Sequence, residues 1–110
     1  IDGGKSAWDL LAEWTPSDFI MQYDTANGMS GGADPVQPIL DWPGRNASLH
    51  LKEAEDKVIG EGPIPWDRVF QAAENGGGVQ WYVVEHEAAS DLSPMDAVEA
   101  CIKSLRRMGK

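Results

Sequence analysis

Three apolar segments of the chain end at or near residue types that bind metal ions. They are residues 19–24, which end at Asp24, residues 47–52, which carry His50, and residues 79–85, which end at Glu85. Carboxylate oxygens and an imidazole nitrogen together suit a hard or borderline divalent cation such as Mn²⁺, Mg²⁺, Co²⁺ or Zn²⁺. The three residues therefore predict a metal site, provided that the fold brings the segment ends together.

Helical patterns separate these segments, and this alternation predicts an α/β fold. We expect four helices, at residues 5–14, at residues 34–42, from Pro65 or Trp66 to the glycines at 76–78, and from Ser93 onward. Strands that alternate with helices form parallel sheets, and functional side chains gather at the carboxyl ends of such strands. Asp24, His50 and Glu85 all lie at those predicted ends.

The remaining patterns define the predicted elements further. The continuous apolar run of residues 19–24 predicts a strand covered on both faces, and the polar, glycine-rich residues 25–32 predict a loop. Ser93 and Pro94 predict the cap and first turn of the last helix. Apolar residues at three- and four-residue steps predict the buried face of that helix, and they are Met95, Val98, Ile102, Leu105 and Met108. We expect Cys101 to be a small core residue on the same side.

Composition limits the classes of function. With 110 residues, 42% of them hydrophobic, the chain is one small domain. The net charge of -9 disfavours nucleic-acid binding. No stretch approaches the roughly 18 apolar residues of a membrane span, so we expect no membrane partner. The single Cys101 fits a reducing compartment, and we expect a cytoplasmic protein.

Each candidate ligand also has a structural explanation. Asp24 fits a turn or cap residue that accepts backbone N–H groups, and a lone His50 fits a hydrogen-bonded core histidine. Glu85 follows so apolar a strand that its burial is costly without a cationic partner. We interpret the three together as metal ligands, because the structural explanations would otherwise have to coincide at one edge of one sheet.

Two further residues are candidates for substrate binding. Asn27 follows Asp24 by three positions and could bind a substrate hydroxyl, although it also fits a plain loop residue before a glycine. Lys52 either reaches the same site or solvates the strand end. His86 and Glu87 follow Glu85 and are explained equally well as loop residues.

An ordered series of short motifs resembles the sugar phosphate isomerase/epimerase family, which has the xylose isomerase-like TIM barrel. The series is YDTAN, GGADP, PGR, LHLK, GEGPIPW, WYVVEHE and SPMDAVEACIKSLRRMG. A complete barrel has eight strands and about 250 residues. The resemblance therefore implies that residues 1–110 are a partial barrel domain, the C-terminal part of a (β/α)8 barrel with three parallel strands and four helices.

The resemblance also implies a site and a reaction. In such proteins Glu, Asp, His and Glu on four strands hold a divalent metal, and this chain supplies the last three as Asp24, His50 and Glu85. The first Glu would belong to a strand before Ile1. The implied reaction is proton transfer next to a carbonyl through an enediolate, with Glu85 as a catalytic acid/base, on a small sugar or polyol.

Two alternatives to the isomerase or epimerase remain open. The same barrel hosts inosose-type dehydratases, whose reaction begins with the same proton abstraction, and the chain could instead be a non-catalytic barrel fragment that acts as an association module. A zinc endonuclease on this barrel would need a basic surface to bind DNA, and the net charge of -9 argues against one. Because a three-stranded parallel sheet has unpaired edges, we expect self-association or pairing with the remainder of the barrel.

Overall fold

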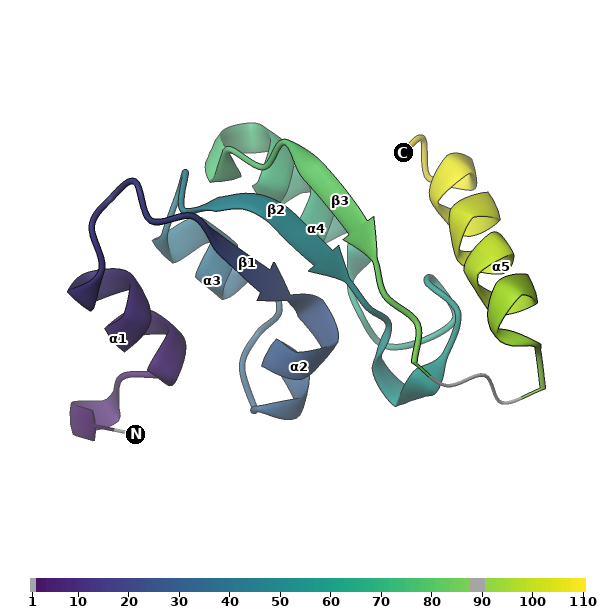
Figure 1. The fold of residues 1–110 in the computed structure, drawn as a ribbon, viewed down its shortest axis with the longest axis horizontal. Coiled ribbons are helices and arrows are strands. Elements are labelled where there is room, and N and C mark those ends of the chain that lie inside the picture. The colour runs from purple at the N-terminus through teal and green to yellow at the C-terminus, as the bar shows by residue number, and fades with distance from the viewer. Residues whose placement is uncertain (1, 88–90) are drawn as a thin grey trace.

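The computed structural model describes residues 2–87 and 91–110, and its strands form one parallel sheet (Figure 1). The strands are β1 (Met21–Asp24), β2 (Asn46–Leu51) and β3 (Trp81–Val84), and they lie side by side in the order β1-β2-β3. Both pairings are parallel. The α/β prediction with three parallel strands is therefore confirmed.

Within the described residues, five α-helices accompany the sheet, rather than the four predicted. They are α1 (Ala7–Trp14), α2 (Thr25–Ser30), α3 (Gln37–Asp41), α4 (Trp66–Ala72) and α5 (Pro94–Arg107), with short segments η1 (Asp2–Gly4), η2 (Ala54–Asp56) and η3 (Ala73–Gly77). The additional helix is α2, where the glycines predicted a loop. Asp24 caps it by accepting the backbone N–H of Asn27, and such a cap outweighs the low helix propensity of Gly28 over so short a helix.

The core lies on the face of the sheet that α3 and α4 cover (Figure 1). Tyr23, Leu49 and Tyr82 stand opposite one another on adjacent strands, and Leu49 is fully buried. The ring of Tyr82 lies edge-on to Phe70 of α4, with 5.2 Å between ring centroids. Since side chains alternate between faces along a strand, the neighbours of these residues point to the other side.

That second face is open in the described part of the chain, contrary to the predicted coverage of residues 19–24 on both faces. Ile20 is 68% exposed, and Trp81 and Val83 of β3 are 70% and 42% exposed. The apolar run was a correct signal for a strand, but burial depends on the elements that pack over it, and none of the described elements buries these three side chains. Large exposed apolar surfaces of this kind are typical of interaction sites.

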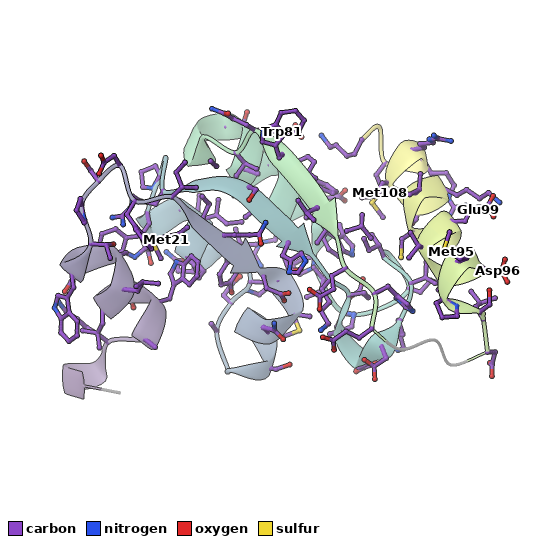
Figure 2. All side chains as sticks on the ribbon, viewed as in Figure 1. Met21, Trp81, Met95, Asp96, Glu99 and Met108 are labelled. Carbon is purple, nitrogen blue, oxygen red and sulfur yellow. The ribbon has the colours of Figure 1, made fainter. Side chains whose placement is uncertain are left out.

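The stripe that α5 buries differs in part from the one predicted: Leu105 is buried and Met108 packs against the core, whereas Met95, Val98 and Ile102 are exposed. The most buried side chains of the helix are those of Ala97, Cys101, Ser104 and Leu105. Met95 is exposed, and Figure 2 shows Asp96 and Glu99 on the outer side of the helix. The loop before α4 packs closely against this stripe, because a Cβ on Gly60 would lie 2.9 Å from Ser104 Oγ. Small side chains therefore face the loop.

The ends of α5 and its thiol follow the sequence signals. Ser93 accepts the backbone N–H of Asp96, and Pro94 occupies the first helical position. Cys101 is buried, as predicted, and burial raises the pKa of its thiol. None of the helices in the described ranges has the length and apolar character that a bilayer crossing requires.

A buried arginine connects α1 to the start of the sheet. Arg45 donates to the backbone carbonyl of Ala12 at 2.7 Å, to the hydroxyl of Thr15 at 2.6 Å and to the carbonyl of Phe19 at 3.3 Å. Cations suit the carbonyl end of a helix. Arg45 is therefore committed to the amino-terminal side of the sheet, at the opposite end of β2 from His50.

Candidate metal centre

The pairing of the strands brings the three predicted ligands to one edge. Asp24 and His50 are direct partners in the pairing of β1 with β2. Glu85 follows the last residue of β3, and its backbone N–H donates to Leu51 O at 3.0 Å. Because all three strands run in the same direction, their carboxyl ends meet at this edge.

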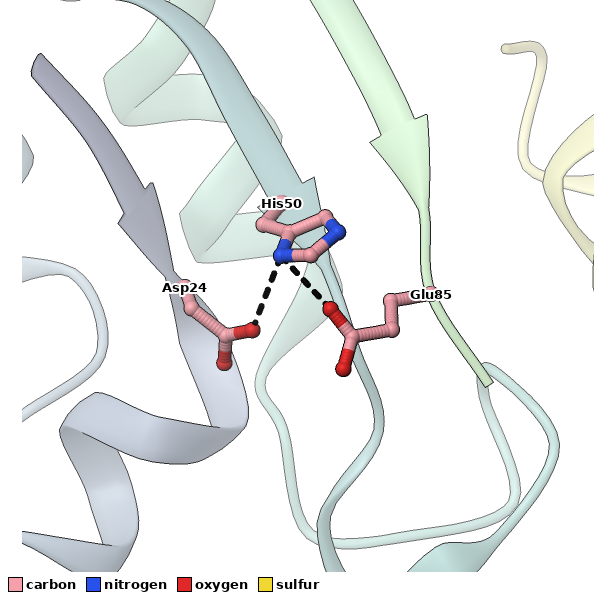
Figure 3. Close-up of side chains that lie close together, drawn as sticks. All are labelled: Asp24, His50 and Glu85. Atoms are coloured by element: carbon pink, nitrogen blue, oxygen red, sulfur yellow. Dashed lines mark ion pairs between the residues drawn. The ribbon is translucent and has the colours of Figure 1, made fainter. Parts of the chain in front are cut away.

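The side chains of these residues converge on one point (Figure 3). His50 Nδ1 lies 3.2 Å from Asp24 Oδ2 and 2.8 Å from Glu85 Oε2. The three candidate ligand atoms all lie within 4.8 Å of one another, and each residue is partly buried. The sequence thus predicted correctly that Asp24, His50 and Glu85 gather at the carboxyl end of the sheet.

The spacing suits a small divalent cation. Ligand atoms that occupy adjacent positions around an ion, each at about 2.1 Å, lie about 3 Å apart. The two contacts of His50 have this length. Asp24 Oδ2 is buried and has no hydrogen-bond partner within the described ranges, and such an oxygen is costly to bury unless a proton or cation meets it. The residues present therefore fit a bound metal.

Asp24 satisfies both explanations considered for it. Its Oδ1 accepts the backbone N–H of Asn27 at 2.7 Å and caps α2, while its Oδ2 points to His50. The cap fixes the rotation of the carboxylate, so that one oxygen is held and the other faces the centre. Local helix capping and the geometry of the cluster are therefore coupled through one side chain.

Lys52 lies beside the cluster and is paired with two carboxylates. Its Nζ is 3.0 Å from Glu85 Oε1 and 2.8 Å from Glu87 Oε2. The hydrogen bond with Glu87 is the largest cause that raises the pKa of Lys52, and the same bond lowers the pKa of Glu87. Both groups are therefore charged at neutral pH.

The main chain of Lys52 is fixed by Thr25, the first residue of α2. The fully buried hydroxyl of Thr25 donates to Lys52 O at 2.7 Å and accepts from Lys52 N at 3.2 Å. This pair of hydrogen bonds joins the end of β2 to the beginning of α2. The side chain of Lys52 therefore extends from a main-chain position that two hydrogen bonds fix.

Asn27 lies next to the cluster without joining it. Its side chain is exposed, and with Asp24 it lines a cavity of about 400 Å³ between α1, β1 and α2. His50 and Glu85 are not among the residues that line this cavity. The structure therefore places Asn27 beside Asp24, and its predicted contact with substrate stays a prediction.

A fourth carboxylate near this edge has a structural role. Glu53 is 3% exposed, and its oxygens accept from the backbone N–H groups of Ala54, Gly60 and Ile64 and from the indole N–H of Trp66. Four donors satisfy both oxygens, so the carboxylate has no capacity left for a ligand. Glu53 shapes the loop between β2 and α4.

Sequence reasoning missed the roles of Thr25 and Glu87. The signal for Glu87 that was missed is the two-residue period of extended chain. This period puts Lys52 on the same face of the sheet as His50, and Glu87 on the same face as Glu85. For Thr25 the sequence contains no such signal, because its partner is 27 positions away and only the pairing of β1 with β2 brings them together.

The fold of this chain is similar to parts of two solved protein structures. Two sugar phosphate isomerase/epimerases from Parabacteroides distasonis have similar structures. The first matches with a TM-score of 0.82 and 25% sequence identity over 94% of this chain, and the second with a TM-score of 0.81 and 26% identity over 89%. The structural match confirms the predicted resemblance. The chain is an α/β fold that matches part of a TIM-barrel protein.

The match covers only part of each solved protein, 36% of the first and 34% of the second. This chain therefore spans about a third of their length. No family model matches the sequence, and no curated protein matches it significantly. The resemblance thus rests on the three-dimensional fold and on moderate sequence identity to the solved structures.

Proposed function

We propose that the chain supplies the Asp, His and Glu ligands of a divalent-metal site in a sugar or polyol isomerase or epimerase. One observation carries the proposal: Asp24, His50 and Glu85, from three different strands, converge on a point with spacings that suit one ion. The similarity to sugar phosphate isomerase/epimerases supports the same assignment. Residues 1–110 are, in this proposal, one part of a larger barrel.

The proposed reaction is proton transfer next to a carbonyl group. A bound Mn²⁺, Mg²⁺, Co²⁺ or Zn²⁺ ion would polarise the carbonyl oxygen of the substrate. The carboxylate of Glu85 removes the proton from the adjacent carbon, and the C–H electron pair becomes the C=C bond of an enediolate. Return of the proton to the neighbouring carbon, together with transfer of the hydroxyl proton to the former carbonyl oxygen, gives an isomer. Delivery of a proton to the opposite face of the original carbon by a second acid gives an epimer.

Asn27 and Lys52 are proposed to contact substrate hydroxyl groups. Asn27 lies next to Asp24 and lines a cavity with it. Lys52 has three N–H donors, of which two are directed to Glu85 and Glu87. The third is available to a hydroxyl oxygen of a small sugar or polyol.

A specific observation also favours an association function. The open face of the sheet exposes Ile20, Trp81 and Val83, and in a closed barrel this face would point to the interior. We propose that the remainder of the barrel or a second copy of the chain covers it. The net charge of -9 argues against a nucleic acid as partner, and the free thiol of Cys101 accords with a cytoplasmic location.

Metal titration tests the site directly. We expect isothermal titration to show Mn²⁺ binding by the chain and a loss of at least about tenfold in affinity for His50→Ala. His86→Ala is the matched control, because His86 is the only other histidine and is not part of the cluster. Equal affinities in His50→Ala and His86→Ala would contradict the proposed site.

Proton exchange tests the reaction. In a complete barrel that contains these residues, with Mn²⁺ and a small ketose in D₂O, we expect deuterium to be incorporated at the carbon next to the carbonyl, measured by NMR, and Glu85→Gln to abolish the incorporation. The mass of the product separates the alternatives, since a dehydratase product is lighter by one water. Exchange that persists in Glu85→Gln would assign the proton transfer to another group.

A further inference from the structure

The cluster contains a fixed positive charge beside the point where a cation would bind. The Nζ of Lys52 contacts Glu85 Oε1, and the other oxygen of the same carboxylate contacts His50. The Lys52 side chain is only 11% exposed, and Thr25 holds its main chain. This ammonium group therefore cannot leave the site easily, and it would repel a divalent cation bound to Glu85 Oε2.

The charges of the site explain how both cations can be accommodated. Asp24 and Glu85 together carry two negative charges, which match one divalent ion. Lys52 adds a positive charge, and Glu87, whose carboxylate lies 2.8 Å from the ammonium nitrogen, adds the negative charge that offsets it. Among the charged groups that this chain supplies, the sum with the ion is zero when Glu87 is included and +1 without it.

We infer that Glu87 is a positioning residue of the metal centre, which neutralises Lys52 so that a divalent cation can bind beside a buried lysine. This inference rests on the proposed function. Lys52 in turn contacts Glu85 Oε1, while Glu85 Oε2 faces His50. The pair thus fixes both the charge and the orientation of one ligand.

A role in folding alone does not account for Glu87. Its side chain is 65% exposed, and exposed ion pairs contribute little to stability. The Lys57–Glu55 pair, at 2.6 Å and with both side chains largely exposed, is an ion pair of the same chemistry away from the cluster. The two pairs differ in that only the first has one partner buried against a predicted ligand.

Mn²⁺ affinity measured by isothermal titration at low ionic strength tests the inference. Glu87→Gln is expected to weaken binding about tenfold, the order expected when one unit charge is unmasked in a partly solvated site. Lys52→Met with Glu87→Gln is expected to restore the affinity to within about threefold of the unaltered chain, because the double variant removes both charges. Glu55→Gln is the matched control and should leave the affinity unchanged.

The dependence on salt separates a charge effect from a structural one. At 0.5 M salt the Debye length is about 4 Å, so the loss of Mn²⁺ affinity in Glu87→Gln should become smaller if it is a charge effect. If the substitution instead distorts the site, the affinity should stay low. Unchanged Mn²⁺ affinity in Glu87→Gln, or a double variant as weak as Glu87→Gln, would overturn the inference alone. Absence of Mn²⁺ binding by the unaltered chain, or binding that does not need His50, would overturn the proposed function as well.

Discussion

The two faces of the sheet carry different kinds of side chain, although they share the same strands. On the helix-covered face, Tyr23 and Leu49 are buried among apolar side chains of α3 and α4. The residues next to these in the sequence lie on the open face. There Asp24 and His50 point to the candidate metal centre, and Trp81 is exposed. A shift of one residue thus separates core packing from chemistry.

The comparison teaches where a carboxylate is structural and where it is free for function. Glu53 turns into the covered side, where N–H groups satisfy both of its oxygens. Asp24 and Glu85 on the open side face a histidine and a lysine instead. Residue type and strand-end position alone do not distinguish these groups. The number of N–H donors around the carboxylate does.

Truncation of the covered face should give the largest effect and so sharpen the comparison. Leu49→Ala removes a fully buried side chain between Tyr23 and Tyr82, and we expect the free energy of unfolding to fall by about 3 kcal/mol. Urea denaturation followed by tryptophan fluorescence measures it. Ser48→Ala, the neighbour on the open face, should cost less than about 1 kcal/mol; similar losses in both variants would remove the distinction between the faces.

Alkaline pH should also act on the covered face. Burial first, then the charges of Asp24 and Asp34, raises the pKa of Tyr23 to about 12 from its ordinary 10.0. A raised pKa favours the protonated folded state, so this stability is fully present below pH 10 and is lost as pH rises toward 12. The loss should reach about 2 kcal/mol.

Tyr23→Phe should lack that part of the alkaline loss, and it should fold normally at pH 7, since the buried hydroxyl has no hydrogen-bond partner within the described residues. Urea denaturation at pH 8 and pH 11.5, with tyrosinate absorbance at each pH, compares the two proteins. The pKa of Tyr82 is also raised, by burial and by its hydrogen bond to Glu74, and this contribution is common to both. Identical pH profiles would show that Tyr23 titrates as a solvated phenol.

Substitution on the open face should give the smallest effect on folding. Trp81→Ala should change the free energy of unfolding by less than about 0.5 kcal/mol at low protein concentration, because Trp81 is 70% exposed. At high concentration, sedimentation velocity should show weaker self-association than in the unaltered chain. A loss above about 1.5 kcal/mol in the monomer would break the comparison, because the open face would then be part of the core.

Much of the fold and of the site could be predicted from local patterns. Apolar runs separated by helix signals indicated three parallel strands, and the residue types at their ends indicated Asp24, His50 and Glu85 as one cluster. The helix α2 could not be predicted from composition, because one side-chain cap at Asp24 outweighs the glycines that follow. The full set of α5 side chains that pack inward was also inaccessible, since it follows from tertiary contacts such as the close approach of Gly60 to Ser104.

The amino-acid sequence by itself determined which residues alternate along each strand and which residue types stand at the strand ends. The reason is that side-chain direction follows a local backbone period. Only the tertiary structure decided that Lys52 pairs with Glu87, that Glu53 is saturated by four donors, and that one face of the sheet is open. These properties depend on distances between segments far apart in the chain, which packing sets and local periodicity does not.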